Sequence, residues 1–256
     1  MPSHRIDRLL ALGPFQRVGP NSSERGGHRE VGTARARRYV HAMPIIQTVL
    51  FDLDGTLIDS VQLILESYRH TLAAHGLPPR SDQEWLSGVG TPLSAQFAAW
   101  RDDPGMMEAL IATYREYNLA NHDRMVRVFP GIVDAVRALR AGRVPMGLVT
   151  SKARQGALRG LRLVGLADAM DVLVCADEVT NAKPHPEPVA TAVRLLGADP
   201  GTTVYVGDSI HDLHSGRGAG VRTAAVLWGP FTRAQLEPGR PDFWLAHPSE
   251  LLSLVE

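Results

Sequence analysis

Hydrophobic and polar positions follow two alternating patterns from residue 43 to the end of the chain. Short apolar runs are typical of buried strands, and stretches with an apolar residue every three or four positions are typical of amphipathic helices. The pattern predicts strands over residues 48–53, 145–150, 171–176, 202–206 and 223–227. It predicts helices that alternate with these strands over residues 132–140, 154–164, 188–196 and 210–219. Repeated strand–helix alternation indicates an α/β fold built on a parallel sheet.

A long helical segment separates the first two predicted strands. Helical periodicity extends over residues 61–75, 84–101 and 106–122. Two parallel strands need only one crossover helix, so this surplus predicts an inserted helical domain over about residues 62–127. Residues 43–61 and 128–256 would then form the α/β core.

Residues 1–42 differ in composition from the rest of the chain. They contain eight arginines and three acidic residues, a stretch rich in glycine, proline and serine, and no clear periodic apolar pattern. Three interpretations are open: a disordered leader, an organelle-type targeting segment, and a translation start placed too early, with Met43 opening the protein. A secretory signal needs an apolar core that this segment lacks, so we favour a dispensable leader or an early start.

Composition and charge argue against several classes of protein. The 27 basic and 27 acidic residues balance, whereas nucleic-acid and membrane-surface binders usually have a basic excess. Cys175 is the only cysteine, so an intrachain disulfide is impossible and a reducing cytoplasm is expected. Uninterrupted apolar runs stay well below the roughly 18 residues that cross a bilayer. We therefore expect a soluble cytoplasmic protein with a small-molecule partner, either a monomer or a homodimer.

Polar side chains close several of the predicted strands, and ligands of parallel α/β sheets bind at this edge. Asp52 and Asp54 end the first strand or follow it directly, and Asp208 follows the strand over residues 202–206, with Asp212 four residues later. Carboxylates at two separate strand ends suit a hard cation such as Mg²⁺, which takes oxygen ligands.

Hydroxyl and lysine side chains accompany these carboxylates. Thr150 closes the second predicted strand and Lys183 lies in a later loop, and both suit a phosphoryl group. The chain has only two lysines, Lys152 and Lys183, among its 27 basic residues. A lysine kept in such an arginine-rich background indicates chemistry that a planar guanidinium cannot supply. Two interpretations of Lys152 stay open: it faces the substrate, or it is a solvated helix start.

These residues resemble the four motifs of the haloacid dehalogenase-like superfamily. The first motif corresponds to residues 51–57 (FDLDGTL), the second to Thr150, the third to Lys183 and the fourth to residues 207–212 (GDSIHD). Their order and spacing match over residues 43–256. The resemblance implies a Rossmann-like parallel core with an α-helical cap inserted after the first motif, which agrees with the insertion predicted from the pattern.

Residue by residue, the resemblance implies a covalent phosphoryl-transfer site. Asp52 would be the nucleophile that forms an aspartyl-phosphate, and Asp54 would protonate the leaving oxygen and then activate water. Mg²⁺ would be held by the Asp52 carboxylate, the Asp54 backbone carbonyl and Asp208, with Asp212 in support.

The resemblance also implies how the phosphoryl group is bound. Thr150 and Lys183 would bind its oxygens, and Leu53 and Ser151 would contribute backbone N–H groups. Positioning and charge neutralisation dominate phosphoryl transfer, so each of these roles is physically reasonable.

Asp54, the second acidic residue of the first motif, narrows the set of reactions that the resemblance allows. Dehalogenases of the superfamily lack it, so Asp54 argues against that activity. Phosphonate-cleaving members need a cap lysine, and residues 60–127 contain none, which excludes that chemistry unless Lys152 substitutes.

Short segments are similar to phosphoglycolate phosphatases, and more so to the inorganic pyrophosphatases within that group. They are residues 67–71, 114–118 continuing through 122–123, and 183–188. We therefore expect a magnesium-dependent phosphohydrolase that acts on a phosphoglycolate-type monoester or on inorganic pyrophosphate. Two alternatives stay open: a sugar-phosphate mutase of the same superfamily, and a non-catalytic regulatory module that binds a phosphate ligand.

Substrate selection is expected to lie in the helical insertion. The core motifs handle only the transferred phosphoryl group and the metal, so the leaving group must be read from the opposite side. The candidate residues are Arg69, His70, Thr91 in the turn over residues 88–91, His122 and Arg124. A basic cluster there would favour pyrophosphate, whose leaving half carries more negative charge than that of phosphoglycolate.

Overall fold

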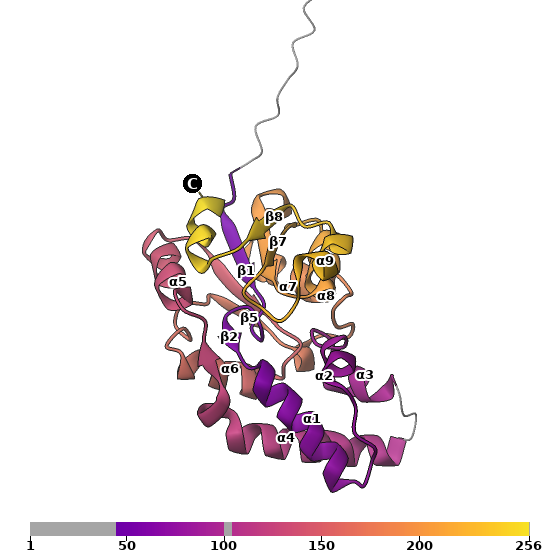
Figure 1. Cartoon of the computed structure of the whole chain (residues 1–256). Coiled ribbons are helices and arrows are strands. Elements are labelled where there is room, and N and C mark those ends of the chain that lie inside the picture. Colours follow the sequence, from indigo (N-terminus) through magenta and orange to yellow (C-terminus); the bar gives the residue numbers. More distant parts are fainter. Residues whose placement is uncertain (1–44, 100–103, 256) are drawn as a thin grey trace, which may run out of the picture. The chain divides into compact units, whose positions relative to one another are not determined.

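The computed structural model describes residues 45–99 and 104–255 of the chain (Figure 1). The leader predicted over residues 1–42 therefore lies outside the described residues. No helix within the described ranges is both long enough and apolar enough to cross a membrane.

The described residues form a central sheet of six parallel strands in the order β5, β4, β1, β6, β7, β8. Their bounds are β1 Thr48–Phe51, β4 Met146–Val149, β5 Val172–Val174, β6 Thr203–Gly207, β7 Arg222–Val226 and β8 Phe243–Leu245. β1 pairs with β4 on one side and with β6 on the other, so Val49 is in register with both Met146 and Val204. The predicted α/β fold with a parallel sheet is confirmed.

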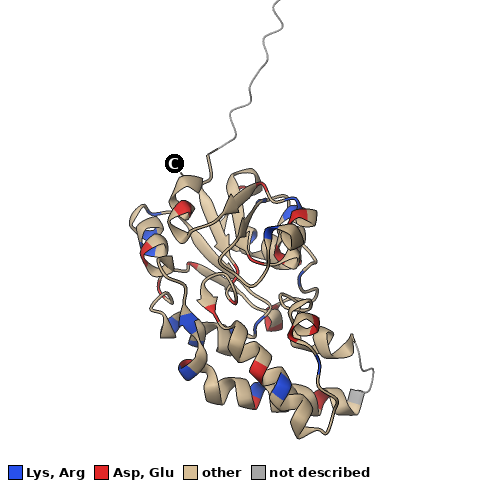
Figure 2. Cartoon of the chain, in the orientation of Figure 1, with Lys and Arg blue, Asp and Glu red and all other residues tan. Residues whose placement is uncertain are grey.

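Helices cover both faces of the sheet, because its strands bury apolar side chains on either side. The α-helices are α5 (Ile132–Ala141), α6 (Arg154–Leu163), α7 (Glu187–Leu196), α8 (Ile210–Gly218) and α9 (Arg233–Leu236). The 3₁₀ segments are η1 (Ala176–Glu178), η2 (Pro200–Thr202), η3 (Glu237–Gly239) and η4 (Pro248–Leu254). Val49 and Phe51 share an apolar cluster with α5 and α6, whereas Leu50 shares one with α7, as the alternation of side chains along a strand requires. In Figure 2 charged residues lie mainly on helices and loops.

The inserted helices lie between two short antiparallel strands. The elements are β2 (Ile58–Asp59), α1 (Val61–Ala74), α2 (Asp82–Leu86), α3 (Leu93–Ala98), α4 (Pro104–Met125) and β3 (Arg127–Val128). These helices share an apolar cluster that is separate from those of the sheet. At its centre the ring of Tyr68 stacks on Trp85 with centroids 3.9 Å apart, and Phe97 and Tyr114 pack against the same ring. The segment therefore has a hydrophobic core of its own, and the β2–β3 pair joins its two ends.

The prediction of one continuous helix around residues 84–101 is wrong. The structure has two short helices, α2 and α3, with a turn between them over residues 87–92. Gly90 adopts a left-handed φ of 97°, and Pro92 lacks the N–H that a continuing helix would use. The pattern also misses β2, β3 and β8, because strands of two or three residues are too short to show a period.

Candidate active site

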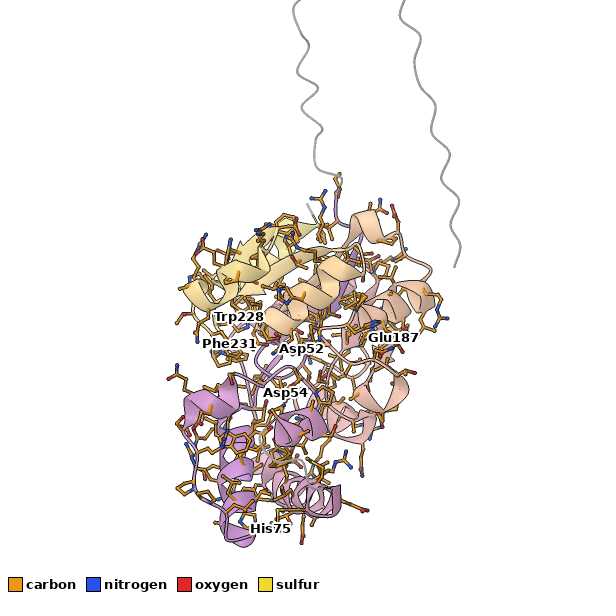
Figure 3. All side chains as sticks on the ribbon, turned by 90° about the vertical axis from the view of Figure 1, so that its right-hand side faces the viewer. Asp52, Asp54, His75, Glu187, Trp228 and Phe231 are labelled. Atoms are coloured by element: carbon orange, nitrogen blue, oxygen red, sulfur yellow. The ribbon has the colours of Figure 1, made fainter. Side chains whose placement is uncertain are left out.

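The carboxyl ends of three neighbouring strands place the motif residues at one edge of the sheet. Asp52 follows β1, Thr150 follows β4 and Asp208 follows β6. Because β1 pairs directly with β4 and β6, these three positions converge. Figure 3 shows Asp52 and Asp54 where the sheet meets the inserted helices.

Lys183 forms the buried centre of this site. Its side chain is 1% exposed, and Nζ donates hydrogen bonds to Asp52 Oδ1 (2.7 Å), Asp212 Oδ1 (2.6 Å) and the Tyr205 hydroxyl (3.0 Å). Burial alone would lower the pKa of Lys183, but the two carboxylates raise it above its usual value. The lysine is therefore a fixed positive charge against the Asp52 carboxyl.

Asp52 keeps one carboxyl oxygen available. Lys183 holds Oδ1, and Oδ2 has no hydrogen-bond partner among the described residues. Burial raises the pKa of Asp52, Lys183 lowers it and Asp212 raises it again, to about 7. A carboxylate nucleophile needs the ionised form, so a further positive charge beside this carboxyl would favour its reactivity.

Asp208 has a buried carboxyl oxygen without a protein partner. Its Oδ1 accepts a hydrogen bond from Thr56 Oγ1 (2.9 Å), whereas Oδ2 has no partner in the described part of the chain. Burial raises the pKa of Asp208 well above its usual range, and the neighbouring Asp212 and Asp52 raise it further. Gly55 (φ 88°) passes so close that a Cβ there would lie 2.5 Å from Oδ2, so only glycine fits at this position.

These carboxylates fit a hard divalent cation. One oxygen from each of Asp52, Asp208 and Asp212 lies within 4.8 Å of the others. Both oxygens of Asp212 have partners: Lys183 donates to Oδ1, and the backbone N–H (3.0 Å) and hydroxyl (2.6 Å) of Ser209 donate to Oδ2. The open oxygens therefore belong to Asp52 and Asp208, and an unpaired buried carboxylate oxygen suits a cation that takes oxygen ligands.

Lys152 contacts the second acidic residue of the first motif. Its Nζ donates to Asp54 Oδ1 (2.7 Å), and Ser60 Oγ donates to the same oxygen (2.5 Å). Burial alone would raise the pKa of Asp54, but the Lys152 charge and the two hydrogen bonds lower it below its usual value. Of the two interpretations of Lys152, the structure supports the one in which the lysine faces the site.

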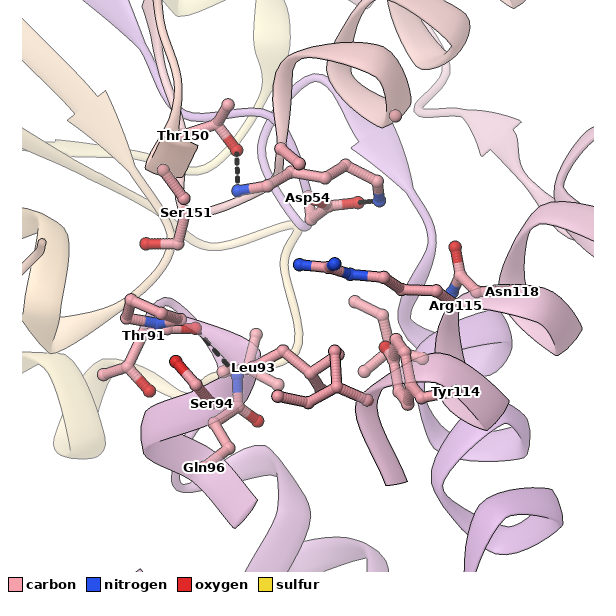
Figure 4. A pocket seen from close by; sticks show the side chains of 18 of the residues that line it. Asp54, Thr91, Leu93, Ser94, Gln96, Tyr114, Arg115, Asn118, Thr150 and Ser151 are labelled. Atoms are coloured by element: carbon pink, nitrogen blue, oxygen red, sulfur yellow. Dashed lines mark hydrogen bonds and ion pairs between the residues drawn. The ribbon is translucent and has the colours of Figure 1, made fainter. Parts of the chain in front are cut away.

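A pocket of about 370 Å³ opens beside these residues (Figure 4). The core side of its wall includes Asp52, Asp54, Thr150 and Ser151, and the other side comes from the inserted helices. Ser151 Oγ donates to the backbone carbonyl of Gly90 (2.6 Å), which joins the two sides. The pocket therefore places any ligand of Asp52 under the inserted helices.

Two of the predicted phosphate-binding residues contribute in different ways. The Leu53 side chain is fully buried in the apolar core, so any contribution to the site must come from its backbone. Thr150 lines the pocket, and its Oγ1 accepts a hydrogen bond from the backbone N–H of Lys152 (3.2 Å). A third predicted residue, Lys183, is not among the residues that line the pocket and contacts Asp52 instead.

The predicted specificity residues are spread over the inserted segment. Thr91 lines the pocket. Arg69 does not, because its guanidinium is held by Glu66 (2.8 Å) and Asp82 (2.6 Å). His70 is also outside the lining, and its ring stacks on an aromatic ring of α4 with centroids 4.3 Å apart.

The two candidates at the end of α4 are also outside the pocket lining. His122 is fully buried and bonds Asp123 Oδ1 through Nδ1 (2.8 Å). Arg124 donates to Asn121 Oδ1 on its own helix (2.7 Å).

Sequence reasoning missed two residues that the structure places in the site. Tyr205 is buried in β6, accepts a hydrogen bond from Lys183, and lies within hydrogen-bond distance of Asp212 Oδ1 (2.9 Å). An aromatic residue in a buried strand is usually a core residue, so only its position two residues before Gly207 was available as a signal. Arg115 lines the pocket, and its place between two aromatic residues of the similar segment 114–118 was the signal.

Comparison with known proteins gives a consistent result. The model of the haloacid dehalogenase-like hydrolases matches residues 49–226. The chain is 42% identical over 210 residues to the pyrophosphatase PpaX of Bacillus pumilus, covering 82% of this chain and 96% of that protein. It is 39% identical over 210 residues to the pyrophosphatase PpaX of Halalkalibacterium halodurans, covering 82% of this chain and 97% of that protein. The solved structure of a haloacid dehalogenase-like family hydrolase from Streptococcus pneumoniae superposes with a TM-score of 0.72 at 25% identity, covering 82% and 99%.

The parallel sheet, with Asp52 and Asp208 at the ends of neighbouring strands, is the arrangement of an α/β enzyme that binds its ligand at this edge. The chain belongs to the haloacid dehalogenase-like hydrolase family. The resemblance predicted from the four motifs is confirmed, and so is the expected enzyme class, a phosphatase of this family. Phosphatases of this family are generally metal-dependent, which agrees with the open carboxylate oxygens of Asp52 and Asp208.

Proposed function

We propose that this chain is a magnesium-dependent phosphohydrolase that cleaves a small phosphate compound through an aspartyl-phosphate on Asp52. Inorganic pyrophosphate is the substrate we favour, and a phosphoglycolate-type monoester is the second choice. One observation carries the proposal: Asp52 lines a pocket, Lys183 holds its Oδ1 at 2.7 Å, and the unpaired buried oxygen of Asp208 lies nearby. The identity of the relatives as pyrophosphatases supports the choice of substrate.

The first step transfers the phosphoryl group to the enzyme. The Asp52 carboxylate attacks phosphorus, the bond from phosphorus to the leaving oxygen breaks, and Asp54 supplies the proton that the leaving oxygen needs. Thr150 binds a phosphoryl oxygen, together with the backbone N–H groups of Leu53 and Ser151. Lys183, whose three protons are held by Asp52, Asp212 and Tyr205, acts through its charge and offsets the repulsion between Asp52 and the anionic phosphoryl group. Mg²⁺, held by Asp52, the Asp54 backbone carbonyl and Asp208, would neutralise negative charge on the phosphoryl group.

The second step releases phosphate. Asp54 accepts a proton from water, the water oxygen attacks phosphorus, and the bond from phosphorus to the Asp52 carboxylate oxygen breaks. The ion pair with Lys152 favours the ionised form of Asp54, which activates water in this step and works against the protonated form that the first step uses. Asp212 supports both steps by positioning Lys183.

The inserted segment, residues 62–127, would act as a cap over this chemistry. Its apolar cluster makes it a separate packing unit, and the pocket lies between it and the core. A cap that shields the pocket from solvent would limit direct attack of water on phosphorus during the first step and so favour attack by Asp52. We also propose that the protein acts in the cytoplasm, on a free small molecule.

Replacing Asp52 by asparagine tests the proposal. Asp52→Asn keeps the side-chain shape and removes the nucleophile, so phosphate release from pyrophosphate with Mg²⁺ should fall to background. The variant should remain folded, which a cooperative melting transition would show. Asp59→Asn is the matched control, because the Asp59 side chain is exposed on β2 and accepts a hydrogen bond from the backbone N–H of Val61 (3.4 Å). Chelation of the metal from the wild type should also abolish phosphate release. Wild-type-like turnover in Asp52→Asn would contradict the proposal, and a folded wild type without turnover would favour a binding module.

A further inference from the structure

Arg115 is the only charged residue that the described part of the inserted helices contributes to the pocket lining. The other lining residues from these helices are apolar or neutral. Arg115 belongs to α4, the helix that faces the second motif across the pocket. A single charge on an otherwise neutral wall singles out this position.

The two amide side chains of the same wall already have partners. Gln96 Nε2 donates to the Thr91 carbonyl (2.8 Å), and its Oε1 accepts from the Tyr68 hydroxyl. Asn118 Nδ2 donates to Ser67 Oγ (3.1 Å). These amides hold the wall in shape, so among the described residues of this wall the side-chain donors left to offer a ligand are the Arg115 guanidinium and the Ser94 hydroxyl, and only Arg115 carries a charge.

The remaining charged lining residues are compensated. Asp52 is paired with Lys183, and Asp54 with Lys152. Asp177 accepts a hydrogen bond from a backbone N–H of α6 (3.0 Å). Arg115, in contrast, has no hydrogen bond or ion pair with any described residue, and Figure 4 shows its guanidinium extending from α4 into the pocket toward Asp54.

Building on the proposed function, we infer that Arg115 binds the oxyanion of the leaving group. A phosphoryl group bound by Asp52 and Thr150 would have its leaving group on the side of Asp54 and the inserted helices, because these residues line the same pocket. A planar guanidinium fork matches a phosphate or a carboxylate in a bidentate arrangement. Both favoured substrates carry such an oxyanion, on the second phosphate of pyrophosphate or on the carboxylate of phosphoglycolate. The interaction strengthens as the leaving phosphate gains charge, so it lowers the barrier as well as improving binding.

The test compares three substrates with and without this guanidinium. Steady-state kinetics with Mg²⁺ are measured on pyrophosphate, phosphoglycolate and p-nitrophenyl phosphate for the wild type, Arg115→Ala and Arg115→Lys. Loss of a charged hydrogen bond should lower kcat/KM of Arg115→Ala by about 10- to 100-fold on the oxyanion substrate, and much less on the aryl ester. Arg115→Lys keeps the charge without the fork and should recover part of the loss. A loss confined to pyrophosphate assigns a leaving phosphate, and a loss confined to phosphoglycolate assigns a leaving carboxylate.

Controls separate this role from a structural one. Arg80→Ala removes another arginine of the inserted segment, which pairs with Glu84 (3.6 Å) and does not line the pocket. The ratios of kcat/KM between the three substrates should therefore stay at their wild-type values. Equal losses on all three substrates in Arg115→Ala would overturn the inference. A larger selective loss in Arg69→Ala or Arg124→Ala than in Arg115→Ala would also overturn it. A wild type that hydrolyses p-nitrophenyl phosphate but neither oxyanion substrate overturns the inference alone, whereas a wild type inactive on all three overturns the proposed function as well.

Discussion

Replacing Lys183 by arginine changes the shape of one buried cation and keeps its charge. Lys183 directs all of its ammonium protons to fixed partners: Asp52 Oδ1 at 2.7 Å, Asp212 Oδ1 at 2.6 Å and the Tyr205 hydroxyl at 3.0 Å. The side chain is 1% exposed, so no solvent-filled space is available for a longer group. A planar guanidinium cannot reproduce three hydrogen bonds that diverge from one nitrogen.

Two magnitudes follow from this geometry. Overpacking a well-packed interior costs about 1–3 kcal/mol, which for a chain of this size lowers Tm by about 2–12 °C. The larger effect falls on activity, because displacing the Asp52 carboxyl by about 1 Å from its reactive position can cost about 100-fold in rate. We therefore expect Lys183→Arg to remain folded at 25 °C and to lose at least about 100-fold in kcat.

The assay is phosphate release from pyrophosphate at saturating Mg²⁺ and substrate, with Tm measured on the same samples. Lys152→Arg is the matched control, because it is the same substitution at the chain's other lysine. Lys152 is 16% exposed and borders the pocket, so an arginine has room there and its loss of kcat should be clearly smaller. Near-normal kcat in Lys183→Arg would refute the reasoning, since it would mean that positive charge alone is needed at this position.

Two further predictions concern a buried hydroxyl and the leader. Tyr205→Phe removes the hydroxyl that accepts a hydrogen bond from Lys183. This change should lower the free energy of unfolding by about 1–3 kcal/mol and should also lower kcat. Unchanged Tm and kcat would show that the hydroxyl is dispensable. A chain that begins at Met43 should fold and keep wild-type turnover, because residues 1–42 show no clear periodic apolar pattern; a large fall in Tm or kcat on truncation would contradict this.

The core of the site was accessible from the sequence because its residues sit at strand ends. Apolar runs that stop at Asp52, Thr150 and Asp208 mark the edge where ligands bind. Strand order was not accessible in this way, because the same runs could be arranged in several orders. The resemblance to a known family implied a Rossmann-like parallel core, and the structure shows that β1 lies between β4 and β6.

The inserted helices were harder to interpret from the sequence. The apolar period of α4 is weak, and its aromatic, charged and small residues occur on all sides, so no face could be assigned to the pocket. Arg69 and Arg124 were favoured for their charge, but each is held by a neighbour: Arg69 by two carboxylates and Arg124 by an amide of its own helix. Segment 114–118 marked Arg115 only as part of a family similarity, and its place on the pocket wall comes from the folded chain.

The most direct test of the account is to trap the phosphorylated enzyme. Wild type is mixed with pyrophosphate and Mg²⁺, quenched in acid within one turnover, and digested for peptide mass spectrometry, with Asp52→Asn treated in parallel. The account predicts one phosphoryl group on Asp52 in the wild type and none in the variant. Active turnover without any phosphorylated peptide, or a phosphoryl group on a different residue, would contradict it.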